Sequence, residues 1–254
     1  TWNMNPEFLK LAIKDRIEKG KKPKAIIVVH LYGMPAKMKE IVEIANKYQI
    51  PIIEDAAESL GSTYFGKPLG CISDFGVYSF NGNKIITTSG GGALISSDSE
   101  MINKAKFLAT QARDDAPHYE HTHIGYNYRL SNVSASIGLG QLEVLQDRVN
   151  TRRDIFNFYK TKLSEIKEIS FLEEIDGFRS NRWLTTILIS KDSRISREEL
   201  RLFLEEDKIE SRPLWKPMHM QPVFEDSPFY GTGVAETMFD NGLCLPSGSN
   251  LSDN

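Results

Sequence analysis

The sequence predicts an α/β fold, with a mostly parallel sheet flanked by helices and a smaller α+β part at the C-terminal end. A β-branched run at residues 25–33, a helical pattern at 36–48 and a short apolar run at 51–55 follow one another, as in a right-handed βαβ unit. Two further strand patterns, at 75–80 and 91–97, extend the same sheet. In the last third of the chain the elements are shorter and more mixed, which indicates a second, smaller unit.

Length and composition are typical of a globular protein. The chain has 254 residues, of which 40% are hydrophobic and 26% charged. We expect residues 1–135 to belong to a large α/β domain, 136–170 to form connecting helices and 171–254 to form the smaller α+β domain. The net charge of −3 indicates no nucleic-acid partner. No apolar run reaches the ~18 residues that predict a membrane span.

Local patterns predict the elements in the first two thirds of the chain. Asn5-Pro6 is a favourable helix cap followed by proline at the first helical position, and apolar residues then recur at every fourth place. The run at 25–33 is continuously apolar, so we expect a strand buried on both faces. Residues 113–128 predict a long surface loop. Residues 131–167 predict one long helix or two in series.

The C-terminal part has its own signals. Residues 183–189 predict a strand, and Ser196 with Glu199 forms a capping box that opens a helix to about residue 207. Residues 209–217 predict a strand that enters a proline-rich loop. These patterns indicate an α+β arrangement.

Asp55 is the first candidate functional residue, because ligands collect at the carboxyl ends of parallel strands and this acid ends the run at 51–55. The alternative is a loop acid that caps a helix. Ala56 and Ala57 leave room beside it for a flat ring, and Glu58 adds a second carboxylate on the same turn. A buried carboxylate that faces a pyridine nitrogen would keep this nitrogen protonated and make the ring an electron sink.

Lys84 is the second candidate. The alternative is an exposed loop lysine, which is the usual position of lysine. Strand-forming residues flank Lys84, and Gly90–Gly92 follow, which suits a close approach of ligand to backbone. A lysine in such a place can act as an amine nucleophile and form a Schiff base. Asp55 and Lys84 together predict a site in which the two residues bind opposite ends of one planar cofactor.

The remaining polar candidates are weaker. Ser79, Ser89 and the amides of Gly90–Gly92 could bind a phosphate, although a single serine in a turn is more often structural. His30 is expected to be a hydrogen-bonded core residue, and His219 either faces a ligand or is a hydrogen-bonded loop residue. We predict no metal site, because the three loop histidines lack a ligand spacing and the two cysteines lie far apart.

Long motifs in a fixed order make the interpretation more specific. They resemble the DegT/DnrJ/EryC1/StrS family of pyridoxal-phosphate sugar aminotransferases, which have fold type I, and the resemblance spans the whole chain. The motifs are EDAAES at 54–59, GSTYFGKPLG at 61–70, DFGVYSFNGNK at 74–84 and GYNYRLSNVSASIGLGQLEVL at 125–145. SNRWLT at 180–185 and RPLWKPMH at 212–219 are most similar to the branch that aminates UDP-4-keto-6-deoxy-N-acetylglucosamine, as in bacillosamine-type synthesis.

The resemblance implies a role for each matching residue. Lys84 stands at the position of the Schiff-base lysine, and Asp55 at that of the acid that pairs with the pyridine nitrogen. Glu58 matches a family position near the ring hydroxyl of the cofactor. A glutamate at this position resembles the enzymes that aminate C4 of the sugar. Ser79 matches a phosphate contact. Asn127 matches an asparagine that reaches the phosphate from the neighbouring subunit, which implies a homodimer with a shared active site.

The implied reaction moves an amino group from L-glutamate to C4 of a nucleotide-linked 4-keto-6-deoxy sugar, with a UDP-linked sugar as the expected substrate. Trp215 and His219 are expected substrate contacts, and surface polysaccharide or glycan synthesis in the cytoplasm is the expected setting. Family members also use GDP- and dTDP-linked sugars. Because the family's chains begin before the position of Thr1 and end after a further helix, we expect a piece of a longer enzyme that lacks part of its site.

Three alternatives stay open. A pyridoxal-phosphate sugar dehydratase of the same fold would carry histidine at the position of Lys84, which disfavours it. A class I aldolase also needs a Schiff-base lysine but no partner for a pyridine nitrogen. An inactive fragment or a regulatory relative would only bind, and the presence of both Asp55 and Lys84 disfavours this reading.

Overall fold

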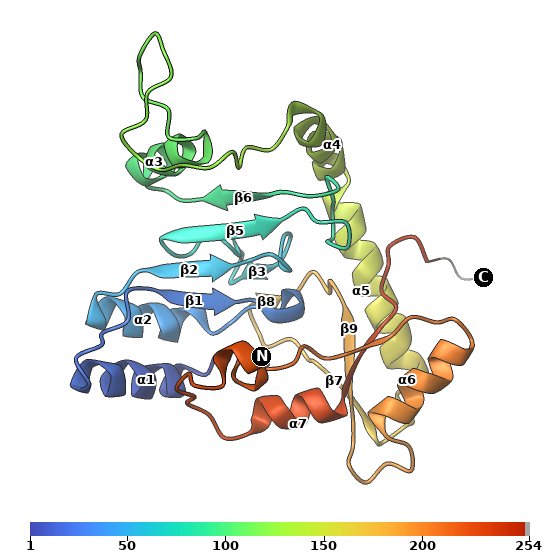
Figure 1. The fold of residues 1–254 in the computed structure, drawn as a ribbon. Helices are drawn as coiled ribbons and strands as arrows, with labels where there is room; N and C mark the ends of the chain where they lie inside the picture. Colours follow the sequence, from blue (N-terminus) through green and yellow to red (C-terminus); the bar gives the residue numbers. More distant parts are fainter. Residues whose placement is uncertain (252–254) are drawn as a thin grey trace.

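The computed structural model describes residues 1–251, arranged as three sheets with helices around them (Figure 1). The N-terminal sheet has the strand order β1 (Ile26–Val29), β2 (Ile52–Asp55), β5 (Phe75–Ser79) and β6 (Gly92–Ile95). β1, β2 and β5 run parallel, whereas β6 is antiparallel to β5. The predicted α/β fold with a mostly parallel sheet is therefore confirmed.

Two helices cover one face of this sheet. α1 (Pro6–Glu18) begins at the predicted cap, where Asn5 Oδ1 accepts a hydrogen bond of 2.8 Å from the N–H of Glu7. α2 (Met38–Tyr48) links β1 to β2 and lies beside α1 (Figure 1). Apolar side chains from both helices and both strands form one buried cluster, which includes Ile13, Val28, Ile41 and Ile52. This burial supplies the main driving force for docking the helices.

The prediction for residues 25–33 is wrong in extent and in burial. The strand ends at Val29, and Leu31–Gly33 form the 3-10 turn η1, in which Tyr32 has a left-handed φ of 55°. The strand is buried on one face only, because Ile27 and Val29 are 58% and 38% exposed. A continuously apolar run therefore did not mean that both faces are covered.

The open face of the N-terminal sheet carries the first candidate residues. Apolar side chains from three strands are exposed there (Ile27, Val29, Val77 and Leu94). The register pairs Val29 with Asp55 and Asp55 with Val77. Because side chains alternate along a strand, Asp55 and Ser79 lie on this same open face. A ligand can therefore approach both residues from one side.

Helices and the predicted long loop follow the N-terminal sheet. α3 (Ser99–Ala109) follows β6, and the long loop predicted at 113–128 separates it from α4 (Asn132–Glu143). α5 (Leu145–Lys162) follows directly, with a break at Val144, so the two-helix alternative for residues 131–167 is confirmed. The segment between β2 and β5 contains a small hairpin. Its strands β3 (Thr63–Tyr64) and β4 (Lys67–Pro68) pair with β8 (Phe178–Arg179).

The C-terminal sheet is antiparallel. Its order is β10 (Arg212–Pro213), β11 (Gly242–Leu245), β9 (Thr185–Ile189) and β7 (Ile169–Phe171). α6 (Arg197–Glu206) begins with the predicted capping box, and α7 (Val234–Asn241) precedes β11. The short 3-10 turns η2 (Met218–Met220) and η3 (Pro222–Phe224) occupy the proline-rich loop.

A second buried cluster joins the two sheets. It contains Tyr32 from η1, Ile86 from the loop after β5, Val149 from α5, Trp183 from the segment before β9 and Cys244 from β11. Elements that are distant in sequence therefore meet beside the carboxyl ends of β2 and β5. Within residues 1–251, no helix is long and apolar enough to cross a membrane.

Candidate active site

Asp55 closes β2 at the open face of the N-terminal sheet. Its side chain is partly buried, and Oδ1 accepts a hydrogen bond of 3.1 Å from the N–H of Ala57. This short turn holds the carboxylate at the end of the strand. The buried Ala56 follows Asp55 and adds no bulk on the open side.

Glu54, the residue before Asp55, anchors the end of β2 through hydrogen bonds. Glu54 is fully buried, and its carboxylate accepts hydrogen bonds from His30 Nε2 (3.0 Å) and from three backbone N–H groups of the following turn (Gly70, Ile72 and Ser73, 2.7–2.8 Å). The N–H of Ala36 donates to His30 Nδ1 across 3.1 Å, so the ring proton of the neutral histidine lies on Nε2. The expectation that His30 is a hydrogen-bonded core residue is confirmed.

Glu58 lies one turn after Asp55 and is held at both carboxylate oxygens. Oε2 accepts the N–H of Tyr32 across 2.7 Å, and Oε1 accepts the indole N–H of Trp215 across 3.1 Å. Burial raises the pKa of Glu58, and the nearby carboxylate of Asp55 adds to this effect. The hydrogen bonds and the positive charge of Lys84 oppose it. Asp55 and Lys84 are therefore both close enough for their charges to act on the Glu58 carboxyl.

Lys84 is positioned by the turn that follows β5. Its N–H donates to the carbonyl of Asn81 across 3.1 Å, and the next residues, Ile85 and Ile86, are buried. Its ammonium lies 4.4 Å from the centroid of the Trp183 ring. The side chain is partly buried and contacts an aromatic ring, which disfavours the exposed loop lysine considered as the alternative.

A cavity of about 420 Å³ lies above the open face of the sheet. Asp55 and Glu58 line it together with Val29, Tyr32 and Trp215. Its walls are mainly apolar, and the two carboxylates are grouped on one side. This donor set fits a planar pyridine cofactor: an acid for the ring nitrogen, a second carboxyl near the ring, and an amine on the adjoining turn.

The candidate phosphate contacts lie outside the lining of this cavity, and Ser89 and Gly90–Gly92 line a separate hollow. Ser79 ends β5 on the open face, and its Oγ accepts the N–H of Asn81 across 3.4 Å. Ser89 has a left-handed φ of 70° and lies in the glycine-rich turn that returns the chain to β6. Both hydroxyls are thus placed by turns at the carboxyl end of β5.

The structure places Asn127 away from Asp55 and Lys84. It is exposed, forms a backbone bridge with Thr110 and lines a separate hollow of about 440 Å³ with Gly90–Gly92 and Arg129. Within one copy of the chain, Asn127 is therefore not brought into the cavity that contains the two carboxylates.

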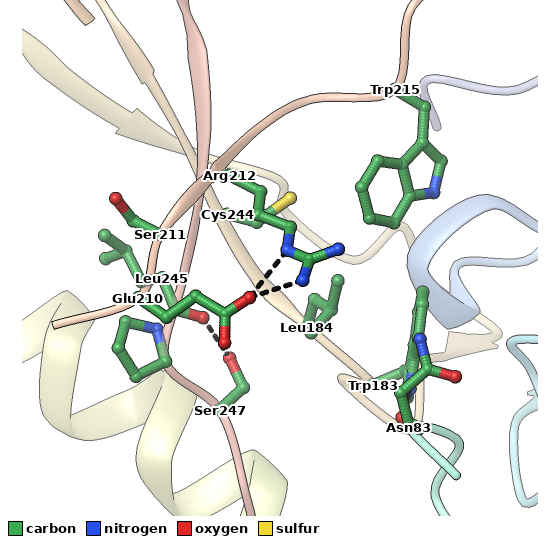
Figure 2. Close-up of a pocket in the computed structure, with 11 residues that line it drawn as sticks. Asn83, Trp183, Leu184, Glu210, Ser211, Arg212, Trp215, Cys244, Leu245 and Ser247 are labelled. Carbon is green, nitrogen blue, oxygen red and sulfur yellow. Dashed lines mark hydrogen bonds and ion pairs between the residues drawn. The ribbon is translucent and has the colours of Figure 1, made fainter. Parts of the chain in front are cut away.

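The two candidate substrate contacts have different surroundings. Trp215 lines the main cavity and also a second, adjoining cavity of about 260 Å³, which Figure 2 shows with Asn83, Trp183 and Arg212. His219 instead bonds to Glu236 Oε1 through Nε2 across 2.8 Å, and its ring stacks on Phe229. The structure thus favours the hydrogen-bonded loop histidine.

Two residues of the site were missed from the sequence. The sequence predicts Tyr32 within a strand, and it predicts Trp183 at the start of another strand and within a family motif. Tyr32 is 2% exposed, and its hydroxyl oxygen accepts the backbone N–H of Trp215 across 2.8 Å. Trp183 is also 2% exposed and contacts the Lys84 ammonium. The HLYG sequence at 30–33, with its glycine, was the one local signal that the strand ends early.

Comparison with known proteins agrees with this geometry. EpsN of Bacillus subtilis (strain 168), named "Putative pyridoxal phosphate-dependent aminotransferase EpsN", is 52% identical over 257 residues, which cover 100% of this chain and 66% of EpsN. GDP-perosamine synthase of Escherichia coli O157:H7 is 36% identical, with 100% of this chain and 66% of that protein covered. This chain thus spans slightly less than two thirds of the length of these curated relatives.

A solved structure shows the same fold. The crystal structure of a DegT DnrJ EryC1 StrS aminotransferase from Brucella abortus superposes with a TM-score of 0.90 at 30% identity, over 99% of this chain and 66% of that one. The model of the DegT/DnrJ/EryC1/StrS aminotransferase family matches residues 1–254. With that match over its whole length, the chain belongs to the DegT/DnrJ/EryC1/StrS aminotransferase family.

Proposed function

We propose that the protein is a pyridoxal-phosphate aminotransferase that moves an amino group from L-glutamate to C4 of a nucleotide-linked 4-keto-6-deoxy sugar. The observation that carries this proposal is the cavity at the open face of the sheet, which Asp55 and Glu58 line, together with the partly buried Lys84 on the turn that follows β5. Family membership supports the same reaction class. When bound, pyridoxal phosphate supplies an electron sink for the electron pair that remains when a proton leaves the carbon bearing the amino group.

Asp55 and Lys84 take the two central roles. The Asp55 carboxylate, held at the strand end, keeps the ring nitrogen protonated through charge and hydrogen bonding. Lys84 Nζ anchors the cofactor at rest. When free, the same amine would accept the proton from Cα of L-glutamate and return a proton to the cofactor carbon that is bonded to the transferred nitrogen, which is general acid–base chemistry.

Glu58 and Ser79 hold the cofactor in place. With both oxygens already accepting N–H groups and with its pKa raised by burial, the Glu58 carboxyl is suited to share a proton with a ring hydroxyl beside it. Ser79 Oγ, at the end of β5, is suited to bind the phosphate.

The substrate is a nucleotide sugar, and a UDP-linked 4-keto-6-deoxy-N-acetylglucosamine is the specific candidate. SNRWLT and RPLWKPMH support the UDP-linked sugar by resemblance, whereas a relative named GDP-perosamine synthase supports a GDP-linked one. Trp215 lies between the two cavities and is suited to contact the sugar. We retain His219 as a weaker candidate contact, because Glu236 and Phe229 already engage its ring.

A second copy of the chain completes the site in this proposal. Asn127 lies in an exposed segment with unusually many bare apolar side chains (Ile124, Tyr128, Val133 and Leu139, each at least 68% exposed). A surface of this kind marks an interaction site. Pairing of two copies across it would bring Asn127 of each copy towards the cavity of the other.

Replacing Lys84 tests the reaction. The full-length protein and its Lys84→Ala variant are assayed with L-glutamate and with UDP-, GDP- and dTDP-linked 4-keto-6-deoxy sugars. We expect the unaltered protein to aminate one of them and to carry a cofactor mass on Lys84 after borohydride reduction. Lys67→Ala, at an exposed lysine of the β3–β4 hairpin, is the matched control. Transamination that persists in Lys84→Ala would show that the proposal is wrong.

Complementation tests the shared site. Lys84→Ala and Asn127→Ala proteins are mixed under conditions that allow subunits to exchange. If Asn127 acts on the partner's site, each mixed dimer regains one intact site, and about a quarter of the activity returns. If Asn127 acts within its own copy, the mixture stays as inactive as its components.

A further inference from the structure

Hydrogen bonds hold Trp183 at its backbone and at its ring. Its N–H donates to Asn181 Oδ1 across 2.9 Å, and its carbonyl accepts a hydrogen bond from the buried guanidinium of Arg152. Its indole Nε1–H donates to the carbonyl of Asn83 across 2.9 Å. Burial lowers the pKa of Arg152 to about 10, which shows how unfavourable the position of that guanidinium is. The indole is therefore held at its backbone and at its ring.

The same indole contacts the lysine turn twice. The Asn83 carbonyl, which receives the indole N–H, belongs to the residue immediately before Lys84 (Figure 2 shows Asn83 against Trp183). The Lys84 ammonium lies over the Trp183 ring, 4.4 Å from its centroid. An aromatic face attracts an ammonium group through its quadrupole. One side chain thus sets the backbone of the turn and the direction of the amine.

The segment of Trp183 is also bound to the turn that carries Glu58. Asn181 Nδ2 donates to the carbonyls of Glu58 (3.0 Å) and Leu60 (2.9 Å). Trp215, whose indole donates to Glu58 Oε1, lies 6.3 Å from Trp183 between ring centroids. The position of Lys84 relative to Glu58 therefore depends on residues 181–183.

We propose that Trp183 is a positioning residue for Lys84. Its indole N–H fixes the lysine turn through the carbonyl of Asn83. Its ring binds the Lys84 ammonium when Lys84 is not bonded to the cofactor. The inference rests on the role proposed above for Lys84 in transamination, but its geometry does not depend on the substrate. The proposal follows from two contacts that one side chain makes.

Chemical labelling of the cofactor-free, full-length protein tests this role. The protein is treated with formaldehyde and cyanoborohydride at a fixed pH, and the methylation of each lysine is followed by peptide mass spectrometry. The measured quantity is the ratio of the Lys84 rate to the Lys47 rate. Lys47 is the matched control, because it lies on the exposed surface of α2, 5.9 Å from the Tyr48 ring.

Two variants separate the two contacts. Trp183→Phe keeps an aromatic face but removes the indole N–H, and Trp183→Leu removes both. We expect the Lys84-to-Lys47 ratio to rise about threefold in Trp183→Phe and about tenfold in Trp183→Leu, within the range of measured cation–π contributions. A ratio within twofold of the unaltered protein in Trp183→Phe overturns the proposal. If Trp183→Leu does not fold, Trp183→Phe alone decides.

Kinetics distinguish positioning from general support. In Trp183→Phe we expect kcat to fall about tenfold while KM for the keto sugar changes less than twofold, because the reacting amine is misplaced but the sugar contacts are kept. If Trp183→Phe lowers the thermal stability but leaves kcat unchanged, Trp183 does not position Lys84. If Lys84→Ala proves active, the proposed function fails, whereas the labelling ratio still reports whether Trp183 holds Lys84.

Discussion

The hydroxyl oxygen of Tyr32 accepts a hydrogen bond from the backbone N–H of Trp215 across 2.8 Å, although the two residues lie 183 positions apart. Their rings are also in contact, with centroids 5.5 Å apart. Tyr32 belongs to the turn after β1, and Trp215 to the loop after β10. This contact holds the proline-rich loop above the cavity that contains Asp55 and Glu58.

Tyr32→Phe should loosen this loop. The substitution removes the acceptor and leaves the Trp215 N–H without its partner, so we expect a loss of about 1–3 kcal/mol in the free energy of unfolding. We also expect KM for the keto sugar to rise several-fold with a smaller change in kcat. Urea unfolding and steady-state kinetics measure the two effects. Tyr48→Phe, at a partly buried tyrosine of α2, is the control, and equal effects in both variants would contradict this role.

Gly33→Ala should disrupt the junction between the two sheets. Gly33 has a φ of +80°, and an added Cβ would lie 1.9 Å from Asn181 Oδ1. Asn181 would have to move and would take the Trp183 segment with it, so we expect a loss of about 3 kcal/mol or more. Gly82→Ala is the matched control, because a Cβ there meets nothing within 4 Å. Thermal unfolding of the two variants should therefore differ by many degrees, and similar melting temperatures would refute the prediction.

Glu54→Gln should destabilise the turn behind Asp55. The amide group would place a donor against backbone N–H groups that now donate to the carboxylate, and we expect a loss of about 3 kcal/mol. The exposed Glu43→Gln on α2 should change the free energy of unfolding by less than about 0.5 kcal/mol. Denaturant titrations of both variants at pH 7 check this. A loss in Glu54→Gln no larger than that in Glu43→Gln would show that the carboxylate is not needed.

The same carboxyl predicts a pH dependence. Hydrogen bonds from His30 and from backbone N–H groups outweigh burial and lower the pKa of Glu54 in the folded protein. The unfolded chain therefore binds a proton more readily than the folded one, so the stabilisation is complete above the unfolded pKa of about 4.3. It is lost as pH falls from there towards the folded pKa. The difference in unfolding free energy between the unaltered protein and Glu54→Gln should shrink between pH 6 and pH 3, and a constant difference would exclude this linkage.

The sequence was sufficient for features that depend on neighbours in the chain. The Asn5-Pro6 start of α1, the capping box of α6 and the position of Asp55 at the end of β2 all follow from local patterns, and the structure contains each of them. Lys84 was identified as a candidate because of the strand before it and the glycines after it. Local hydrogen bonding and side-chain periodicity leave direct marks on sequence.

Other features were decided only by tertiary contacts. The continuous apolar run at 25–33 could not show that its strand stops at Val29 or that one face is bare, because burial depends on what packs against the strand. Tyr32 and Trp183 bond to residues 183 and 100 positions away, and no local pattern encodes such partners. The sequence therefore determined which chemical groups this protein carries at its strand ends. The tertiary structure decided how the Lys84 amine is held, because the ring that it contacts belongs to Trp183, in a segment far away in the sequence.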